Sequence, residues 1–364
     1  MKSVPGKRLY ELDALRGFAA LYVVFYHYTM NRPQSNAFLE MGFTSVDLFF
    51  LISGFVITMT LEHCRSGKEF LVKRFIRLYP SYWVCMSITT LLLVRYGFEH
   101  FNRQSFVKYL ANLTMFSQYL GQINMDGAYW SLLTELCFYI LVLLIFVWRK
   151  MEKIEWIVAG CLLALSVFGI ITRFFPISDG AFKNLYTYAT IVLMLPTLLA
   201  GMCFYRLMYK GRTTYRYLLI AGCLLTSLCI QHLDPRTPLI GGVRFFTMLA
   251  LHYGIFFLFV HGRLGFIVNR VTLFLGKISY PLYLLHMGMG LLIVIPNLNL
   301  YMPIWPAILL TIAIMMTTAY LVHILVEKPV QAFFKKRWLT PADKGSQQPG
   351  KDHTLTELAG AVQQ

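Results

Sequence analysis

The stretch GAYWSLLTELCFYILVLL, residues 127–144, contains Glu135 as its only charged side chain. An apolar helix of roughly 20 residues crosses the ~30 Å hydrocarbon core of a lipid bilayer. Similar apolar stretches recur along most of the chain, which is 57% hydrophobic and 14% charged. Ordinary soluble domains carry about 25% charged residues. The sequence therefore predicts one membrane domain rather than a set of soluble domains.

These stretches predict an all-helical (all-α) integral membrane protein, a bundle of about ten transmembrane helices. The expected spans are residues 12–30, 44–62, 79–97, 129–148, 154–172, 185–207, 217–231, 243–260, 278–296 and 304–326. The semi-polar run FVKYLANLTMFSQYL, residues 106–120, is predicted to form an interfacial or re-entrant helix on the outer face. We assign residues 1–338 to the membrane domain. Residues 339–364 contain few large apolar side chains and are predicted to form a disordered cytoplasmic tail.

Lysine and arginine are unevenly distributed over the segments that connect these ten spans. Most of the 33 Lys and Arg residues lie on the side that contains both termini. Because cytoplasmic loops are enriched in Lys and Arg, both termini are predicted to be cytoplasmic. The expected location is the cell inner (cytoplasmic) membrane. This distribution accounts for the net charge of +16 without a nucleic-acid partner. The seven cysteines include no CxxC pair, so no metal site is predicted.

Ionisable residues within the first two spans are candidates for function, because each costs at least ~2.5–3.5 kcal/mol to insert. Arg16 and His27 are separated by about three helical turns and share one face of the first span. Asp47 begins the second span and is expected at the depth of His27, where a carboxylate would orient the imidazole as a general base. Alternatively, Arg16 reaches lipid phosphates, His27 is an interfacial histidine and Asp47 only stabilises a helix N-terminus.

A basic cluster, formed by Lys73, Arg74 and Arg77, precedes the third span in EFLVKRFIRLYPSYWV. Pro80 is expected to start the helix of that span. Arg74 and Arg77 are one helical turn apart, so the cluster is suited to binding the phosphates of coenzyme A. The alternative is that these cations only set the topology or contact lipid headgroups.

The fourth and ninth spans contribute further polar side chains. Glu135 is expected to face the interior of the bundle, where it would orient an arginine or histidine or bind a sugar hydroxyl. In GKISYPLYLLHMGMG, we expect Ser279, Tyr280 and His286 to contact the substrate. For His286, a packed polar residue without a role in binding is an equal alternative.

These segments resemble the acyltransferase-3 family of integral-membrane O-acyltransferases, which modify bacterial lipopolysaccharide, exopolysaccharide, Nod factors and peptidoglycan. The resemblance extends from about Leu9 to Gln331 and includes, in order, LDALRGFAALYVVFYHY, VDLFFLISGFVI, KRFIRLYP, YWSLLTELCFY, SYPLYLLH and VEKP. The order and spacing of the six fragments carry the resemblance, since any one apolar fragment is unspecific.

The resemblance implies roles for particular residues. His27 corresponds to the catalytic histidine of the family and Arg16 to its paired basic residue. Asp47 and Glu135 match acidic positions. The remaining match is to an arginine motif near the acyl-CoA entrance, represented here by Arg74 and Arg77. Many relatives also carry an extracytoplasmic SGNH hydrolase-like domain, which this sequence does not show, so we expect transfer by the membrane domain alone or with a glycan-assembly partner protein.

The residues and the resemblance together predict an O-acyltransferase, most simply an O-acetyltransferase. It would move an acyl group, most simply acetyl, from cytoplasmic acetyl-CoA or another acyl-CoA to a hydroxyl of a cell-surface polysaccharide, lipopolysaccharide or lipid-linked sugar. Direct transfer with His27 as general base and a transient acyl-histidine are both compatible with the sequence. The rival hypothesis is a transporter with a His/Asp/Glu proton relay, which the absence of an internal repeat disfavours.

Overall fold

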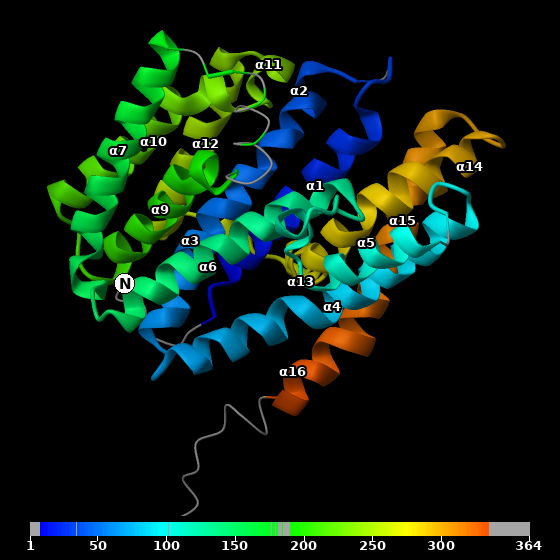
Figure 1. The fold of residues 1–364 in the computed structure, drawn as a ribbon, viewed down its shortest axis with the longest axis horizontal. Helices are drawn as coiled ribbons and strands as arrows, with labels where there is room; N and C mark the ends of the chain where they lie inside the picture. The colour runs from blue at the N-terminus through cyan, green and yellow to red at the C-terminus, as the bar shows by residue number, and fades with distance from the viewer. Residues whose placement is uncertain are drawn as a thin grey trace, which may run out of the picture.

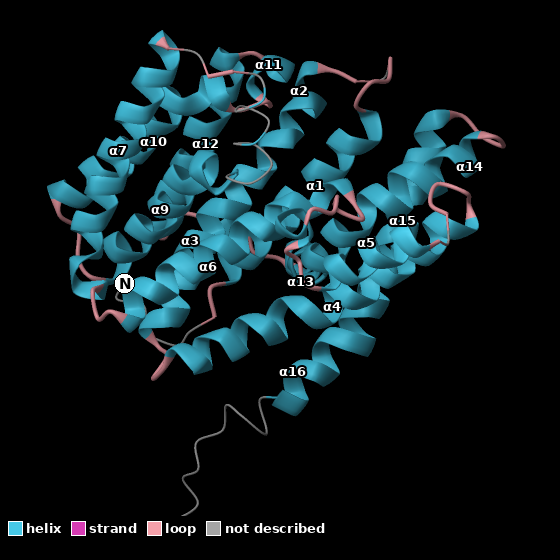
Figure 2. Ribbon diagram, in the orientation of Figure 1, coloured by secondary structure: helices cyan, strands magenta, loops and turns pink. Residues whose placement is uncertain are grey.

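A computed structural model describes residues 8–334 except 34, 101, 176, 179, 181–183 and 185–189. Within these residues all regular secondary structure is helical, as Figure 2 shows. The predicted all-helical fold is therefore confirmed. The predicted tail, residues 339–364, and the first part of the predicted sixth span lie outside the described residues.

The chain forms fifteen α-helices in its described part and two π-helical segments. The α-helices are α1 (Tyr10–Thr29), α2 (Ala37–Glu40), α3 (Ser45–Glu62), α4 (Gly67–Arg95), α5 (Arg103–Leu113), α6 (Trp130–Val147), α7 (Ile154–Phe174), α9 (Thr190–Tyr209), α10 (Thr214–Ile230), α11 (Thr237–Ile240), α12 (Gly242–Val260), α13 (Arg270–Leu285), α14 (Ile295–Asn299), α15 (Ile304–Val322) and α16 (Lys328–Phe334). The π-helical segments are η7 (His286–Val294) and η8 (His323–Glu327). Short 3₁₀ turns occupy Met41–Thr44, Ser117–Leu120, Gly127–Tyr129, Met151–Lys153, Gln231–Leu233 and Gly265–Ile267.

Eight helical stretches of the described chain are long and apolar enough to cross a membrane. They are Ala37–Glu62, Gly127–Val147, Met151–Phe174, Thr190–Tyr209, Thr214–Leu233, Gly242–Val260, Arg270–Asn299 and Ile304–Phe334. These correspond to the predicted second span and to the fourth through tenth. Helices α1 and α4, with 20 and 29 residues, match the first and third spans but are not among the eight. The count of ten spans and the cytoplasmic position of both termini stay predictions.

Helix α4 begins well before the predicted third span, and the expected helix start at Pro80 is wrong. The side chain of Ser66 accepts a hydrogen bond from the backbone N–H of Glu69, which caps the helix twelve residues upstream of the expected boundary at residue 79. Pro80 lies inside α4, where the surrounding helices of a bundle tolerate the missing backbone N–H. The basic cluster is consequently helical and continuous with the span.

Part of the predicted interfacial segment is also helical. Helix α5 (Arg103–Leu113) starts at Asn102, whose side chain accepts a hydrogen bond from the backbone N–H of Ser105. Its position on the outer face stays a prediction.

Helix α1 lies at the centre of the bundle, between α3 and α13, and contacts both (Figure 1). On one side α13 packs against α15 and α4; on the other, α3 packs along α9, which contacts α10. The approach of α3 to α9 depends on Gly54 and Gly201. A Cβ atom on either glycine would collide with a backbone carbonyl of the facing helix, from Leu198 or Leu51. Small residues permit such close packing where helices cannot rely on hydrophobic association.

Candidate active site

A cavity of about 1050 Å³ lies among α1, α3, α4, α6 and α13. Side chains from the start of α1, the end of α3, the first half of α4 and α16 line it, so it reaches the end of the bundle where these segments meet. Ligand cavities in proteins usually measure roughly 300–1,000 Å³, so this one has room for a large ligand. The predicted site residues that line it are Arg16, Lys73, Arg74, Arg77, Glu135, Ser279 and Tyr280.

Arg16 and Arg74 line this cavity, and each carries one buried N–H donor without a partner among the described residues. Arg16 Nη2 donates to Asp13 at 2.7 Å, and Arg74 Nη2 donates to Thr60 Oγ1 at 2.6 Å. The Nε atoms of both arginines are buried and have no hydrogen-bond partner among the described residues. An unsatisfied buried donor costs about 1–3 kcal/mol, and more when charged. The guanidinium charges of the two arginines that line the cavity favour an anionic ligand.

The other two predicted cations are partly engaged. Lys73 Nζ lies 2.7 Å from a Glu69 carboxylate oxygen, and hydrogen bonding from Lys73 is the main reason why the pKa of Glu69 is lowered. Arg77 Nη1 lies 3.9 Å from Glu327, and its guanidinium lies 5.7 Å from the ring centroid of Tyr280. Among the described residues, Arg77 thus lines the cavity with only a long-range ion pair to Glu327.

Glu135 lines the same cavity and accepts hydrogen bonds from two hydroxyl groups. Its Oε1 accepts hydrogen bonds from Ser53 at 2.8 Å and from Tyr139 at 2.7 Å. The hydroxyls of Ser279 and Tyr280 donate to the backbone carbonyls of Gly276 and Leu78. The oxygens of these two hydroxyls can therefore still accept a hydrogen bond from a ligand.

His27 and His286 are not among the described residues that line the cavity. Their ring centroids are 5.1 Å apart, so α1 and the start of η7 bring the two imidazoles together. The link to the cavity is Tyr283, which lines it and whose ring centroid lies 5.3 Å from that of His286.

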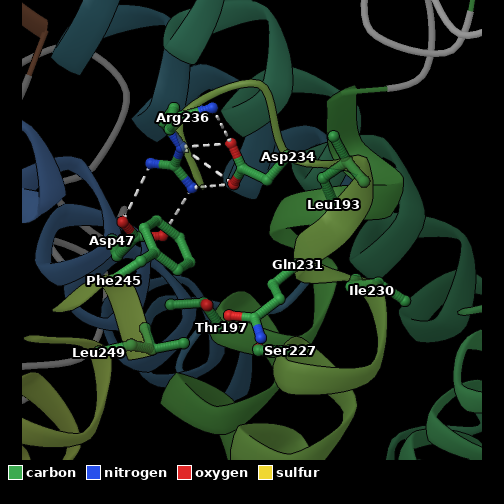
Figure 3. A pocket seen from close by; sticks show the side chains of 10 residues that line it. All are labelled: Asp47, Leu193, Thr197, Ser227, Ile230, Gln231, Asp234, Arg236, Phe245 and Leu249. Carbon is green, nitrogen blue, oxygen red and sulfur yellow. Dashed lines mark hydrogen bonds and ion pairs between the residues drawn. The ribbon is translucent and has the colours of Figure 1, made fainter. Parts of the chain in front are cut away.

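The predicted contact between Asp47 and His27 is wrong. Figure 3 shows that Arg236 binds the Asp47 carboxylate, with Nη1 and Nη2 at 3.0 and 3.1 Å from its oxygens. Arg236 also binds Asp234 through Nε and Nη2, the latter at 2.7 Å. A guanidinium that can form paired hydrogen bonds to a carboxylate is a stronger partner than a neutral imidazole. We call Asp47, Asp234 and Arg236 the Arg236 cluster.

The sequence did not indicate the role of Arg236 and Asp234, because both lie in a loop between predicted spans. In a loop, an arginine is taken only as a sign of membrane topology. The only local signal is that Asp234, Pro235 and Arg236 are consecutive, so a cation and a carboxylate lie beside a rigid residue. Burial alone would lower the pKa of Arg236, but the charges of Asp234 and Asp47 outweigh burial and raise it. The adjoining cavity measures about 10 Å³, roughly the space for one water molecule.

The described residues contain no group of three or more His, Cys, Asp or Glu side chains placed to hold a metal ion. The donors that line the large cavity are instead cations and hydroxyls, which suit an organic anion.

Comparison with known proteins finds the acyltransferase-3 family, whose sequence model is described as "Acyltransferase domain" and matches residues 9–327. The candidate acetyltransferase ORF330 of Acidianus two-tailed virus is 25% identical over 285 residues, which cover 77% of this chain and 82% of that protein. The candidate peptidoglycan O-acetyltransferase YrhL of Bacillus subtilis is 25% identical over 354 residues, covering 88% of this chain and 54% of YrhL.

O-acetyltransferase OatA of Staphylococcus aureus is 33% identical over 146 residues, covering 36% of this chain and 23% of OatA. The chain thus spans about half the length of YrhL and about a quarter of that of OatA. No solved structure matches the chain.

Proposed function

Because the chain belongs to the acyltransferase-3 family and is an acyltransferase, we propose that it moves an acetyl group from acetyl-CoA to a hydroxyl of a cell-surface glycan. The observation that carries this proposal is the large cavity lined by arginines, next to the paired imidazoles of the half-buried His27 and the buried His286. Two relatives that are named as O-acetyltransferases, one of them for peptidoglycan, support a glycan acceptor.

The donor is acetyl-CoA, whose phosphates bind at the end of the cavity that is lined by Lys73, Arg74 and Arg77. The guanidinium of Arg74, which lines the cavity, supplies a charge-assisted hydrogen bond, which is worth about 1.5–3 kcal/mol. The acetyl end then points into the bundle, toward Arg16 and Glu135.

The reaction takes place beside Tyr283, which lines the cavity and lies next to the histidine pair. His27 accepts the proton of the acceptor hydroxyl while the hydroxyl oxygen attacks the thioester carbonyl carbon. Arg16 lies about three helical turns from His27 and stabilises negative charge along the path of the donor, between the basic cluster and the histidines. The carbon–sulfur bond then breaks, and His27 returns the proton to the coenzyme A thiolate. Glu135 and the hydroxyls of Ser279 and Tyr280 position the substrates.

Isotope transfer tests this function directly. The purified protein in lipid nanodiscs is incubated with radiolabelled acetyl-CoA and a cell-surface glycan fraction, and label in the glycan is counted. His27→Ala should lower transfer by roughly 10²–10⁴-fold, as expected for the loss of a general base. His252→Ala provides the matched control, because His252 is a buried histidine of α12 outside the cavity. Near-normal transfer by His27→Ala would refute the assignment of the base, and a transporter would label no glycan with any variant.

Sidedness requires a separate test. Cysteines introduced at Lys73, which lines the cavity, and at the exposed Asn31, which follows α1, should react with an impermeant thiol reagent from opposite faces of the membrane. The background must lack Cys64, because its Sγ lies 3.5 Å from Lys73 Nζ. Acetyl-CoA should protect position 73 alone. Labelling of both positions from one face would contradict the proposed entry route.

A further inference from the structure

The pair formed by His27 and His286 contains two polar atoms without partners. His27 Nδ1 and His286 Nε2 are both buried, and neither forms a hydrogen bond within the described structure. The ring centroids are 5.1 Å apart and the ring planes are inclined by 49°. Two adjacent unsatisfied nitrogens are costly unless one donates to the other or both bind a ligand.

The backbone determines which of these nitrogens can accept. His286 Nδ1 lies 2.6 Å from the carbonyl oxygen of Tyr283. A carbonyl oxygen only accepts hydrogen bonds, so Nδ1 of His286 must carry the proton. In the neutral ring, Nε2 of His286 is then an acceptor with a free lone pair. The complementary partner is a donor on His27, which is its Nδ1–H.

The distance fits such a bond. An N–H···N hydrogen bond of about 2.9–3.0 Å between two imidazoles places their centroids roughly 5 Å apart. The separation of the two rings is therefore compatible with such a bond once the two nitrogens face each other. The bond would satisfy both orphaned nitrogens at once.

The helices around the pair hold it in place. His286 is the first residue of η7, and π-helical segments often occur at functional sites. Asp126 accepts a hydrogen bond from the backbone N–H of Gly288 at 2.6 Å, which attaches η7 to the segment that precedes α6. From the α1 side, Tyr28 packs its hydroxyl so close to Gly290 that a Cβ atom there would collide with it. The two elements that carry the histidines are thus locked together.

We propose that His286 orients His27 by accepting its Nδ1–H, the role that the sequence had led us to expect of Asp47. The relay runs from the Tyr283 carbonyl through His286 to His27. It leaves the lone pair of His27 on Nε2, facing the acceptor hydroxyl, and it stabilises the imidazolium that forms when Nε2 takes the proton. This inference rests on the proposed role of His27 as the base. In it, His286 is a positioning residue.

Two amide variants of His286 separate orientation from packing. The side-chain amide of His286→Gln reaches about the position of Nε2, whereas that of His286→Asn reaches only about the position of Nδ1. His286→Asn should lower kcat roughly 100-fold and leave the KM for acetyl-CoA within about 2-fold. His286→Gln should keep at least about a tenth of the wild-type kcat, because it still accepts from His27.

The outcomes of this experiment are distinct. Equal activity of the two variants, at whatever level, would overturn the relay while leaving the proposed function intact, provided that His27→Ala is inactive. Near-normal activity of His27→Ala would overturn both the relay and the proposed base.

A measurement on the wild-type protein does not depend on the folding of variants. The ¹⁵N chemical shifts of selectively labelled histidine distinguish protonated from unprotonated ring nitrogens, and the His27 signals are those lost in His27→Gln. The relay requires a proton on Nδ1 of His27 and none on Nε2. A proton on Nε2 of His27 would overturn the inference.

Discussion

The large cavity and the Arg236 cluster both bring charged groups into the bundle, yet they treat these charges in opposite ways. The cavity measures about 1050 Å³ and is lined by Arg16 and Arg74, whose Nε atoms have no hydrogen-bond partner among the described residues. The cluster adjoins a space of about 10 Å³, and Arg236 forms ion pairs with both Asp47 and Asp234 (Figure 3). Charged side chains that line a large cavity can bind a ligand. Charged side chains that are paired with one another hold helices together.

This difference limits the inference that an ionisable residue inside a membrane protein is functional. By that rule Asp47 ranks with Arg16 and His27, since all three lie in apolar spans. The structure instead ties Asp47 of α3 to the loop before α11, far along the chain. A buried ion pair of this kind contributes to the specific arrangement of helices, as we expect here, rather than to chemistry.

The largest effect is expected from removing the cation of the Arg236 cluster. Arg236→Met leaves Asp47 and Asp234 buried without a counter-charge and should destabilise the protein by about 3–5 kcal/mol. Thermal unfolding in detergent and the folded fraction in size-exclusion chromatography measure this. Wild-type stability of Arg236→Met would show that the cluster does not hold the helices.

The matched control removes all three charges together. The triple variant Asp47→Asn, Asp234→Asn, Arg236→Met has no buried ions, so it should regain most of the lost stability and retain acyl transfer. A triple variant that folds but does not transfer acetyl groups would place the cluster in the reaction and erase the contrast with the cavity.

A smaller effect is expected in the cavity. Arg74→Ala should raise the KM for acetyl-CoA by an amount that corresponds to one charge-assisted hydrogen bond, about 1.5–3 kcal/mol, with little change in kcat. Steady-state kinetics at varied acetyl-CoA concentration measure this. Arg65→Ala is the control, because Arg65 is exposed near the same helix end and does not line the cavity. Equal KM values for the two variants would mean that Arg74 only sets the topology.

The smallest effect is expected where a cavity cation is already paired. Glu69 competes with acetyl-CoA for Lys73, since a Glu69 carboxylate oxygen lies 2.7 Å from Lys73 Nζ and both side chains are partly exposed. Glu69→Gln should lower the KM for acetyl-CoA by less than about 5-fold, because exposed ion pairs contribute only ~0.2–1 kcal/mol. A rise in KM would show that Glu69 supports binding of the donor instead of opposing it.

The helical fold could be predicted from the sequence because apolar runs of the right length have few other solutions in a bilayer. The boundaries of the later helices follow the runs closely, as in α6 and α12. The start of α4 could not be found this way. Its first turns are polar, and the Ser66 cap that begins it carries no signal in hydropathy.

The candidate site could be predicted only in part, because spacing along one helix says nothing about partners from another. The residues expected to bind the donor do line one cavity, since helical periodicity puts Lys73, Arg74 and Arg77 within about one turn. The proximity of His27 to His286 depends on how α1 packs against α13 and η7. Likewise, the partner of Asp47 comes from a distant loop. Such pairings are properties of tertiary packing.

The π-helical geometry of η7 makes the number of residues in this segment important, independently of which residues they are. A π-helical turn holds more residues than an α-helical turn, so each extra residue rotates the next helix by about 100° relative to an uninterrupted α-helix. Deleting a single residue between 287 and 294 would therefore turn α14 to present a different face, even if every side chain around His286 were kept. An insertion or deletion in this segment can therefore change the site, as a substitution can.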